Sequence, residues 1–251
     1  MYDLHLYSRK FSNFIKKVKI FENMISFNRL PTILVLSFFI LFFSNLLNGQ
    51  ETDLLMVNSK KIDQKRYEDV KGNPYLYKKW KKGSIISADA DVIENVLLNY
   101  NGESNSFEIK KDNRFIELDP RWYVRVLVEE EPDEAAVIFQ KNFLPPLEGK
   151  FTRLVYNGKK IKVVEEFTSK ISTKVFNNVG KNLEVKDFYN KKQYFLIRDK
   201  KAVPLRLKKK NLLSALGEKA LLESFIKKEK LKLDSEAQLI QLLDFFEQII
   251  Q

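Results

Sequence analysis

Cations and aromatic rings are concentrated around residue 80. The segment 78–82 reads Lys-Lys-Trp-Lys-Lys and follows two tyrosines, at positions 75 and 77. Aromatic faces between cations stack on sugars or bases, lysines neutralise phosphates, and a tryptophan also lies at the headgroup level of membranes. Trp80, Lys79 and Lys81 are therefore the candidate contacts for a glycan or an anionic lipid. The structural alternative buries Trp80 at one end of a β-sandwich with solvated lysines around it.

Imidazole and thiol groups are missing from the part of the chain that would do the chemistry. The only histidine is His5, and the sequence has no cysteine. Residues 50–251 therefore lack Ser-His-Asp and Cys-His catalysis, a zinc site of His and Cys ligands, and disulfides. A carboxylate-dependent hydrolase is the enzyme class that stays open, since it needs two facing acids. Because the sequence selects no such pair, we expect a non-enzymatic protein with no catalytic residues.

Nucleotide and calcium motifs are also missing. The eight glycines are scattered, and the closest two, Gly149 and Gly158, form neither a dinucleotide-binding motif nor a phosphate-binding loop. Asp89, Asp91 and Glu94 lie close together, but Ile93 stands where the third ligand of a calcium loop is required. We expect a solvated turn there, with no metal and no cofactor.

The net charge of the chain is +11, and lysine supplies most of the positive charge. Within residues 50–251, 31 cationic side chains are lysines and only 7 are arginines. Arginine supplies the planar fork that reads bases and clamps phosphates, whereas lysine is a strongly hydrated point charge. This excess predicts solubility and a weak attraction to anionic surfaces, without nucleic-acid binding.

An apolar segment near the N-terminus predicts export. Residues 33–43 contain a single polar residue, Ser37, which fits the core of a signal peptide and is short for a membrane-spanning helix. We place the cleavage between Gly49 and Gln50, so residues 1–49 form an N-terminal extension and signal peptide, with Met24 as an alternative start. The expected destination is the periplasm or the outer membrane. The alternative is a single-pass inner-membrane anchor through residues 31–47.

The remaining chain divides into three parts. Residues 50–82 are polar and mixed in charge, and we interpret them as a leading arm with one short helix around residues 59–70. Residues 83–207 carry the period-two pattern and the turn residues of short antiparallel strands. Asn157-Gly158 predicts a tight hairpin, and Asp199-Lys200 predicts a second one. In this region Phe107 and Ile109 alternate with Glu108 and Lys110, and the run 122–128 places Trp122 on the same face as three valines.

Residues 208–251 follow a helical pattern. Leucines recur at helical spacing from Leu212 onward, and Gly217 is placed as a C-terminal cap or break. Asp234 or Ser235 begins a last helix that carries a wide apolar stripe. Since such a stripe must be covered, we expect these helices to fold back on the sheet or on each other, with a partner protein as the alternative.

Several of these patterns together resemble a family. The residues are the Gly-Asn-Pro-Tyr-Leu-Tyr run at 72–77, Trp80 and Gly83, the Leu-Leu-Asn-Tyr-Asn run at 97–101, the Tyr-Phe-Leu at 194–196 and the lysine-rich helical tail. This pattern, which spans most of residues 72–251, resembles a group of exported, uncharacterised β-rich envelope proteins of Gram-negative bacteria. The resemblance implies export and a β-domain with a helical tail, and it carries no catalytic residues.

The sequence thus predicts an α+β protein with an antiparallel β-sandwich or a partly open barrel, followed by a C-terminal helical tail. The expected function is that of an exported, non-enzymatic envelope protein that binds another macromolecule through its sheet edge, the segment 78–82 or the tail. A glycan- or lipid-binding module and a carboxylate-dependent hydrolase are the alternatives. The expected partners are an envelope protein, a glycan or an anionic lipid.

Overall fold

A computed structural model gives the structure of the protein. It describes residues 59–111, 114–130, 135–142, 144–178 and 181–250. The chain divides into two units, 1–52 and 53–251, and every described residue belongs to the second. The predicted signal peptide, its cleavage at Gly49 and Gln50, and the alternative anchor at 31–47 lie outside the described residues. Within the described part, no helix is long and apolar enough to cross a membrane.

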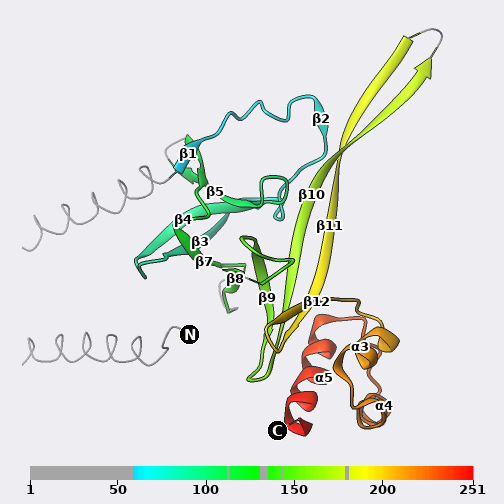
Figure 1. Cartoon of the computed structure of the whole chain (residues 1–251). Helices are drawn as coiled ribbons and strands as arrows, with labels where there is room; N and C mark the ends of the chain where they lie inside the picture. Colours follow the sequence, from blue (N-terminus) through cyan, green and yellow to red (C-terminus); the bar gives the residue numbers. More distant parts are fainter. Residues whose placement is uncertain (1–58, 112–113, 131–134, 143, 179–180, 251) are drawn as a thin grey trace, which may run out of the picture. The chain divides into compact units, whose positions relative to one another are not determined.

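The fold is α+β, as predicted (Figure 1). One large, open sheet of twelve strands precedes three helices. The strands are β1 Ser59–Lys61, β2 Val70–Lys71, β3 Lys81–Ser87, β4 Val92–Asn101, β5 Ser106–Lys111, β6 Arg114–Leu118, β7 Tyr123–Val128, β8 Val137–Lys141, β9 Phe151–Asn157, β10 Ile161–Asn178, β11 Lys181–Arg198 and β12 Lys201–Leu205. The helices are α3 Lys209–Leu216, α4 Lys219–Lys228 and α5 Glu236–Ile249.

The sheet follows the order β1-β6-β5-β4-β3-β7-β8-β9-β10-β11-β12, with β2 paired to β11. All pairs along this path are antiparallel, and only β2 and β11 run parallel. The sequence predicted a β-sandwich or a partly open barrel. The strands form one open sheet, which corresponds to the second of these. The hairpins predicted at Asn157-Gly158 and Asp199-Lys200 are confirmed, because they join β9 to β10 and β11 to β12.

The leading arm differs from its prediction. No helix forms within residues 59–70; Ser59–Lys61 pairs with β6 instead, and turns lead from there to β2. The arm then runs beside β4, where Leu76 N–H donates to Tyr100 O and Gly102 N–H donates to Pro74 O, both at 2.9 Å. The arm contains few apolar residues, so it cannot form a helix with a wide apolar face. Hydrogen bonds to the edges of neighbouring strands hold it in place instead.

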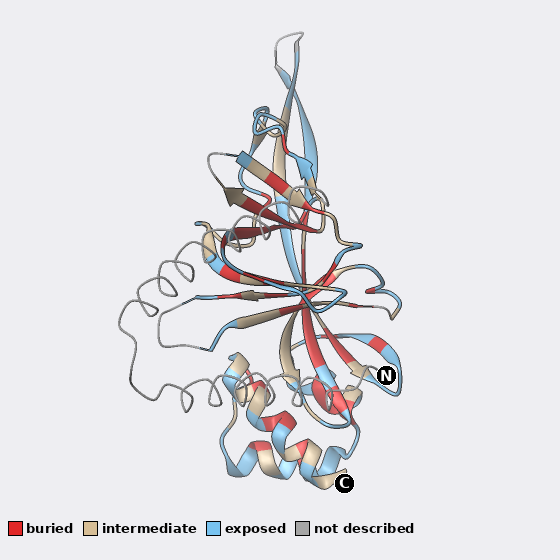
Figure 2. Cartoon of the chain, turned by 90° about the vertical axis from the view of Figure 1, so that its left-hand side faces the viewer, coloured by how far each residue is buried: buried red, intermediate tan, exposed pale blue. Residues whose placement is uncertain are grey.

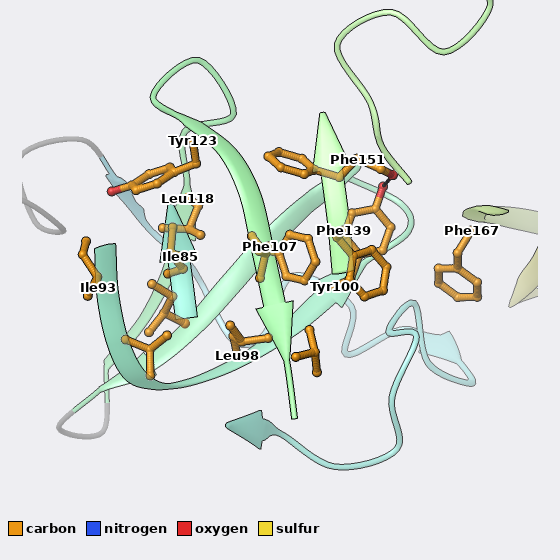
Figure 3. Close-up of a cluster of buried hydrophobic side chains, with 14 residues drawn as sticks. Ile85, Ile93, Leu98, Tyr100, Phe107, Leu118, Tyr123, Phe139, Phe151 and Phe167 are labelled. Carbon is orange, nitrogen blue, oxygen red and sulfur yellow. Dashed lines mark hydrogen bonds between the residues drawn. The ribbon is translucent and has the colours of Figure 1, made fainter. Parts of the chain in front are cut away.

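The first core lies under strands β3 to β9 and includes Phe167 of β10 (Figure 3). Tyr100 and Phe107 pack at 5.0 Å between ring centroids, and Phe107 lies 5.2 Å from Phe139. The first contact joins the neighbouring strands β4 and β5, and the second joins β5 to β8, which is distant in the sequence, so these buried rings hold the sheet together.

The second core lies between the sheet and the helices. Leu239, Leu242, Leu243 and Phe246 of α5 are buried against residues of β10, β11, β12, α3 and α4. The expectation that the apolar stripe folds back on the molecule is therefore confirmed. Gly217, with φ +82°, separates α3 from α4, and the hydroxyl of Ser235 accepts from Gln238 N at the start of α5, as the pattern predicted.

Two side chains lie on faces that differ from the predicted ones. Trp122 precedes β7 and is exposed, whereas Tyr123 is buried, because the register of β3 and β7 shifts between Ile86 and Ser87. Glu108 was expected on the solvent side of its strand and is fully buried. The leading arm covers that face of β5, and its side chains contact the carboxylate.

Candidate functional site

The fold separates Trp80 from the two lysines of the predicted site, Lys79 and Lys81. Trp80 ends the arm just before β3 and is half-buried, with Tyr75 at 5.8 Å and Phe115 at 5.3 Å between ring centroids. Lys79 is exposed, and Lys81 donates from Nζ to Glu130 O at 3.1 Å while lying over the Tyr77 ring. Trp80 thus belongs to a packed aromatic group, and the two lysines face other surroundings.

Trp80 lines a cavity of about 570 Å³. Its walls come from four places in the sequence: the β1–β2 turns, the β2–β3 connection, β6 and β11. Five aromatic or apolar rings contribute, namely Tyr67, Tyr75, Trp80, Phe115 and Phe188, and every one of these is half-buried. Neither Lys79 nor Lys81 is among the described residues that line it.

The carboxylate of Glu108 holds two side chains of the cavity wall, Tyr75 and Arg66, in place and also accepts a hydrogen bond from Asn101. Tyr75 Oη donates to Glu108 Oε2 at 2.7 Å, and Asn101 Nδ2 donates to Glu108 Oε1 at 2.7 Å. The guanidinium of Arg66 forms an ion pair with the same carboxylate. A buried charge is tolerated only when it is paired and hydrogen-bonded, and Glu108 meets both conditions.

The tyrosines at this site are held neutral. Burial raises the pKa of Tyr67 to about 12, and its hydrogen bond to Glu103 at 2.6 Å acts in the same direction. Burial, together with the hydrogen bond to Glu108, also raises the pKa of Tyr75 well above its usual value of 10. For Arg66, burial lowers the pKa, but the charge of Glu108 outweighs it and the net direction is upward. The site therefore keeps two phenol donors and one guanidinium over the physiological pH range.

Two further buried acids are also held by cations. Arg153 of β9 contacts Glu165 of β10 at 3.1 and 3.2 Å, and Lys192 Nζ lies 3.3 Å from the same carboxylate. Lys150 Nζ contacts Glu166 at 2.5 Å. These ion pairs link β10 to neighbouring segments of the sheet, so both acids serve to bind cations within the protein.

A second candidate surface is the distal part of the hairpin formed by β10 and β11. These strands pair over their full length from Ile161–Arg198 to Asn178–Lys181. β9 pairs with β10 only as far as Glu165, and β12 pairs with β11 only from Tyr194 onward. We call residues 170–178 and 181–189 the ribbon, and Figures 1 and 2 show it extending away from the rest of the sheet with mostly exposed residues.

The ribbon carries large apolar side chains in contact with water. They are Ile171, Val175, Phe176, Leu183 and Tyr189, with exposed fractions of 42%, 56%, 52%, 60% and 63%. Phe176 faces Leu183 across the two strands, so these two side chains share one face. Val175, one residue earlier, lies on the opposite face.

The predicted turn at Asp89 and Asp91 forms as expected. Residues 88–91 are exposed, and Asp91 N–H donates to the hydroxyl of Ser87 at 3.0 Å. No group of three metal-ligating side chains occurs among the residues that the structure describes.

Sequence patterns missed two features of these sites. The partnership of Arg66 with Glu108 joins residues 42 positions apart, and no local period signals it. Between the two hairpin turns the sequence predicts strands only at residues 161–167 and 194–198, and it assigns no strand to the ribbon between them. Its apolar pairs Ile171 with Phe188 and Phe176 with Leu183, which face each other across the two strands, are the signal from which it could have been found.

Comparison with protein-family models, with curated proteins and with solved structures finds no match to this chain.

Proposed function

We propose that this is an exported, non-enzymatic protein of the cell envelope that binds another macromolecule, an envelope protein, through the ribbon. The observation that supports this most directly is the exposure of Val175, Phe176 and Leu183, each more than half accessible to solvent. Soluble proteins rarely leave neighbouring large apolar side chains uncovered unless a partner covers them.

The edges of the ribbon offer a second means of binding. Beyond Glu165, no described strand pairs with the outer edge of β10, apart from the hydrogen bond that Ser169 N–H donates to Gly102 O at 2.9 Å. The backbone N–H and C=O groups of residues 170–178 that point away from β11 are thus available to pair with an added strand. Strand addition gives affinity through main-chain hydrogen bonds, and pockets for alternate side chains give specificity.

The ribbon is also poorly supported by the rest of the protein. A two-stranded hairpin is at best marginally stable alone in water, and residues 171–177 are all exposed. The base is held by β2, which pairs at Lys186 and Asp187, and by the ion pair between Lys186 and Asp69. A segment of this kind gains order when a partner covers it.

The non-enzymatic part of the proposal draws on the state of the buried acids. Glu108, Glu165 and Glu166 are each engaged by an arginine or a lysine. A carboxyl group that acts as a general acid must be available to transfer a proton to a substrate, whereas these three carboxylates are engaged in ion pairs within the protein.

Site-specific photo-cross-linking tests the proposal. A photoreactive residue at Phe176, introduced in the native host, is expected to capture one defined envelope protein. Leu221 of α4 is the matched control, since its exposed fraction of 51% is almost equal to the 52% of Phe176. Equal labelling from both positions, or no adduct from Phe176, would contradict a binding role for the ribbon.

A shortened hairpin provides an independent test. Replacing residues 174–185 by Asn-Gly joins Thr173 to Lys186, which already face each other across the strands, and keeps the pairing with β2. The variant is expected to fold with an unchanged melting temperature and to lose the captured partner. Retention of the partner by the folded variant would place the interaction elsewhere.

A further inference from the structure

The cavity at Trp80 shares Phe188 with the ribbon, but none of the ribbon's exposed apolar side chains lines it, so it needs its own explanation. It lies where the leading arm runs from β1, paired with β6, to β2, paired with β11 (Figure 1). The arm therefore connects two distant strands of the same sheet and borders the open space between them. Its volume of about 570 Å³ falls within the range of about 300–1,000 Å³ that is usual for small-ligand sites.

The aromatic side chains leave ring faces available to this space. Tyr75 and Trp80 meet at an interplanar angle of 54°, Trp80 and Phe115 at 62°, and Tyr67 and Phe188 at 88°. None of these pairs is stacked face to face. Rings that meet edge to face cover less of each other, so flat apolar surface is left for a ligand.

The charges on the cavity wall cancel. Asp63 and Glu68 contribute two negative charges, and Lys65 and Arg66 contribute two positive ones. The guanidinium is also paired with Glu108, which lies fully buried behind it, so these groups together carry no excess of positive charge. A phosphate or sulfate ligand needs such an excess, so these charges favour a ligand without net charge.

Hydrogen-bonding groups complete the wall. The amides of Gln64 and Asn73 lie on it together with the charged groups, and both residues are exposed. The bonds of Glu108 to Tyr75 and Arg66 fix the orientation of two wall residues before any ligand arrives. Such preorganisation reduces the entropic cost of binding.

From this combination of ring faces, cancelled charge and amide groups, we propose that the cavity binds a neutral saccharide. Sugar rings present apolar C–H faces that lie on aromatic rings, and equatorial hydroxyls that bond with amides, carboxylates and guanidinium groups around the edge. This inference goes beyond the partner-binding role of the ribbon, and it stands or fails independently of it.

Fluorescence titration and calorimetry with the full chain test the proposal. The probes are three neutral hexasaccharides, of β-1,4-linked glucose, α-1,4-linked glucose and β-1,4-linked N-acetylglucosamine, with a sulfated hexasaccharide as the anionic probe. At least one neutral probe is expected to bind and to change tryptophan emission. Binding of none of the neutral probes, or binding of the sulfated one alone, would overturn the proposal.

The two tryptophans of the sequence allow a matched comparison. Trp80→Leu keeps apolar volume between Tyr75 and Phe115 but removes the flat ring, and it is expected to weaken saccharide binding roughly tenfold or more. Trp122→Leu, at an exposed position elsewhere, is expected to leave the affinity unchanged. The reverse result would place the saccharide at Trp122 and overturn the assignment to the cavity.

A third variant keeps the test decisive if Trp80→Leu fails to fold. Gln64 is exposed on the cavity wall, so Gln64→Ala is expected to leave the melting temperature unchanged and to weaken saccharide binding about threefold to tenfold, as for a lost hydrogen bond. Unchanged affinity in folded Gln64→Ala would exclude the cavity as the binding site.

Discussion

Glu108 is the residue whose environment departs most from its local pattern. It alternates with Phe107 and Ile109 as a solvent-facing residue should, yet its carboxylate is fully buried and contacts Arg66, Tyr75 and Asn101. Two of these three partners come from the arm. The residue therefore links the arm to the sheet, and its charge is required to compensate that of Arg66.

Replacing this acid tests the link. Glu108→Gln keeps the shape but leaves the Arg66 guanidinium without its counter-charge, so we expect the free energy of unfolding to fall by about 2 kcal/mol or more. Chemical denaturation at pH 7 measures this change. Glu103→Gln is the control, because Glu103 is exposed and accepts a single hydrogen bond from Tyr67. If both substitutions lowered the free energy of unfolding equally, the buried ion pair of Glu108 would contribute nothing to stability beyond an exposed hydrogen bond.

At the scale of elements, a polar network joins the helices to the sheet. Arg153 of β9 contacts both Glu165 of β10 and Glu236 in the first turn of α5, the latter with Nη1 to Oε2 at 2.8 Å. Tyr194 Oη of β11 lies 3.3 Å from Glu236 Oε1. Since Glu236 also lies at the positive end of the helix dipole, the network fixes the start of α5 on the sheet.

This network predicts a dependence of stability on pH. Burial raises the pKa of Glu165, but the hydrogen bond and charge of Arg153 and the charge of Lys192 outweigh it, so the folded pKa lies below the usual 4.5. A lowered pKa stabilises the fold above pH 4.5, and this contribution is lost as the pH falls through the folded pKa. Glu165→Gln is expected to lower the free energy of unfolding by about 2 kcal/mol at pH 7 and to flatten its decline below about pH 5.

Urea denaturation at a series of pH values measures both effects. Glu94→Gln is a suitable control, because Glu94 is exposed on β4. The assignment would be wrong if Glu165→Gln declined with acid as steeply as the unsubstituted protein.

At the scale of the whole molecule, the proposed export divides the chain into a removed segment and a working part. The apolar residues 33–43 and the small residue Gly49 support cleavage before Gln50. N-terminal sequencing of the native protein from the envelope fraction is expected to begin at Gln50. A native chain that keeps residues 33–43 would contradict cleavage and favour the membrane anchor, and recovery in the cytoplasm would contradict export.

The sequence by itself determined the elements that depend on local pattern. Alternating residues and the Asn157-Gly158 turn determined short strands and their hairpins, and the stripe ending in Phe246 determined a helix that must be covered. Gly217 and Ser235 marked helix ends because the conformation of a cap depends on a few neighbouring residues. Residues 50–251 contain no histidine or cysteine, which excluded imidazole and thiol chemistry. This conclusion depends on composition alone and requires no knowledge of the fold.

Only the tertiary structure decided how distant residues meet. Arg66 and Glu108 are brought together because the arm pairs with β6 and β11 at two separate points, and the same path encloses Trp80 in a cavity while Lys79 and Lys81 face elsewhere. The length of the ribbon was likewise undecided, since the described strand residues between 168 and 193 pair with each other and with the short β2, apart from the bond of Ser169 to Gly102. Local periods report which face of one element is apolar, and they carry no information on which other element, if any, covers that face.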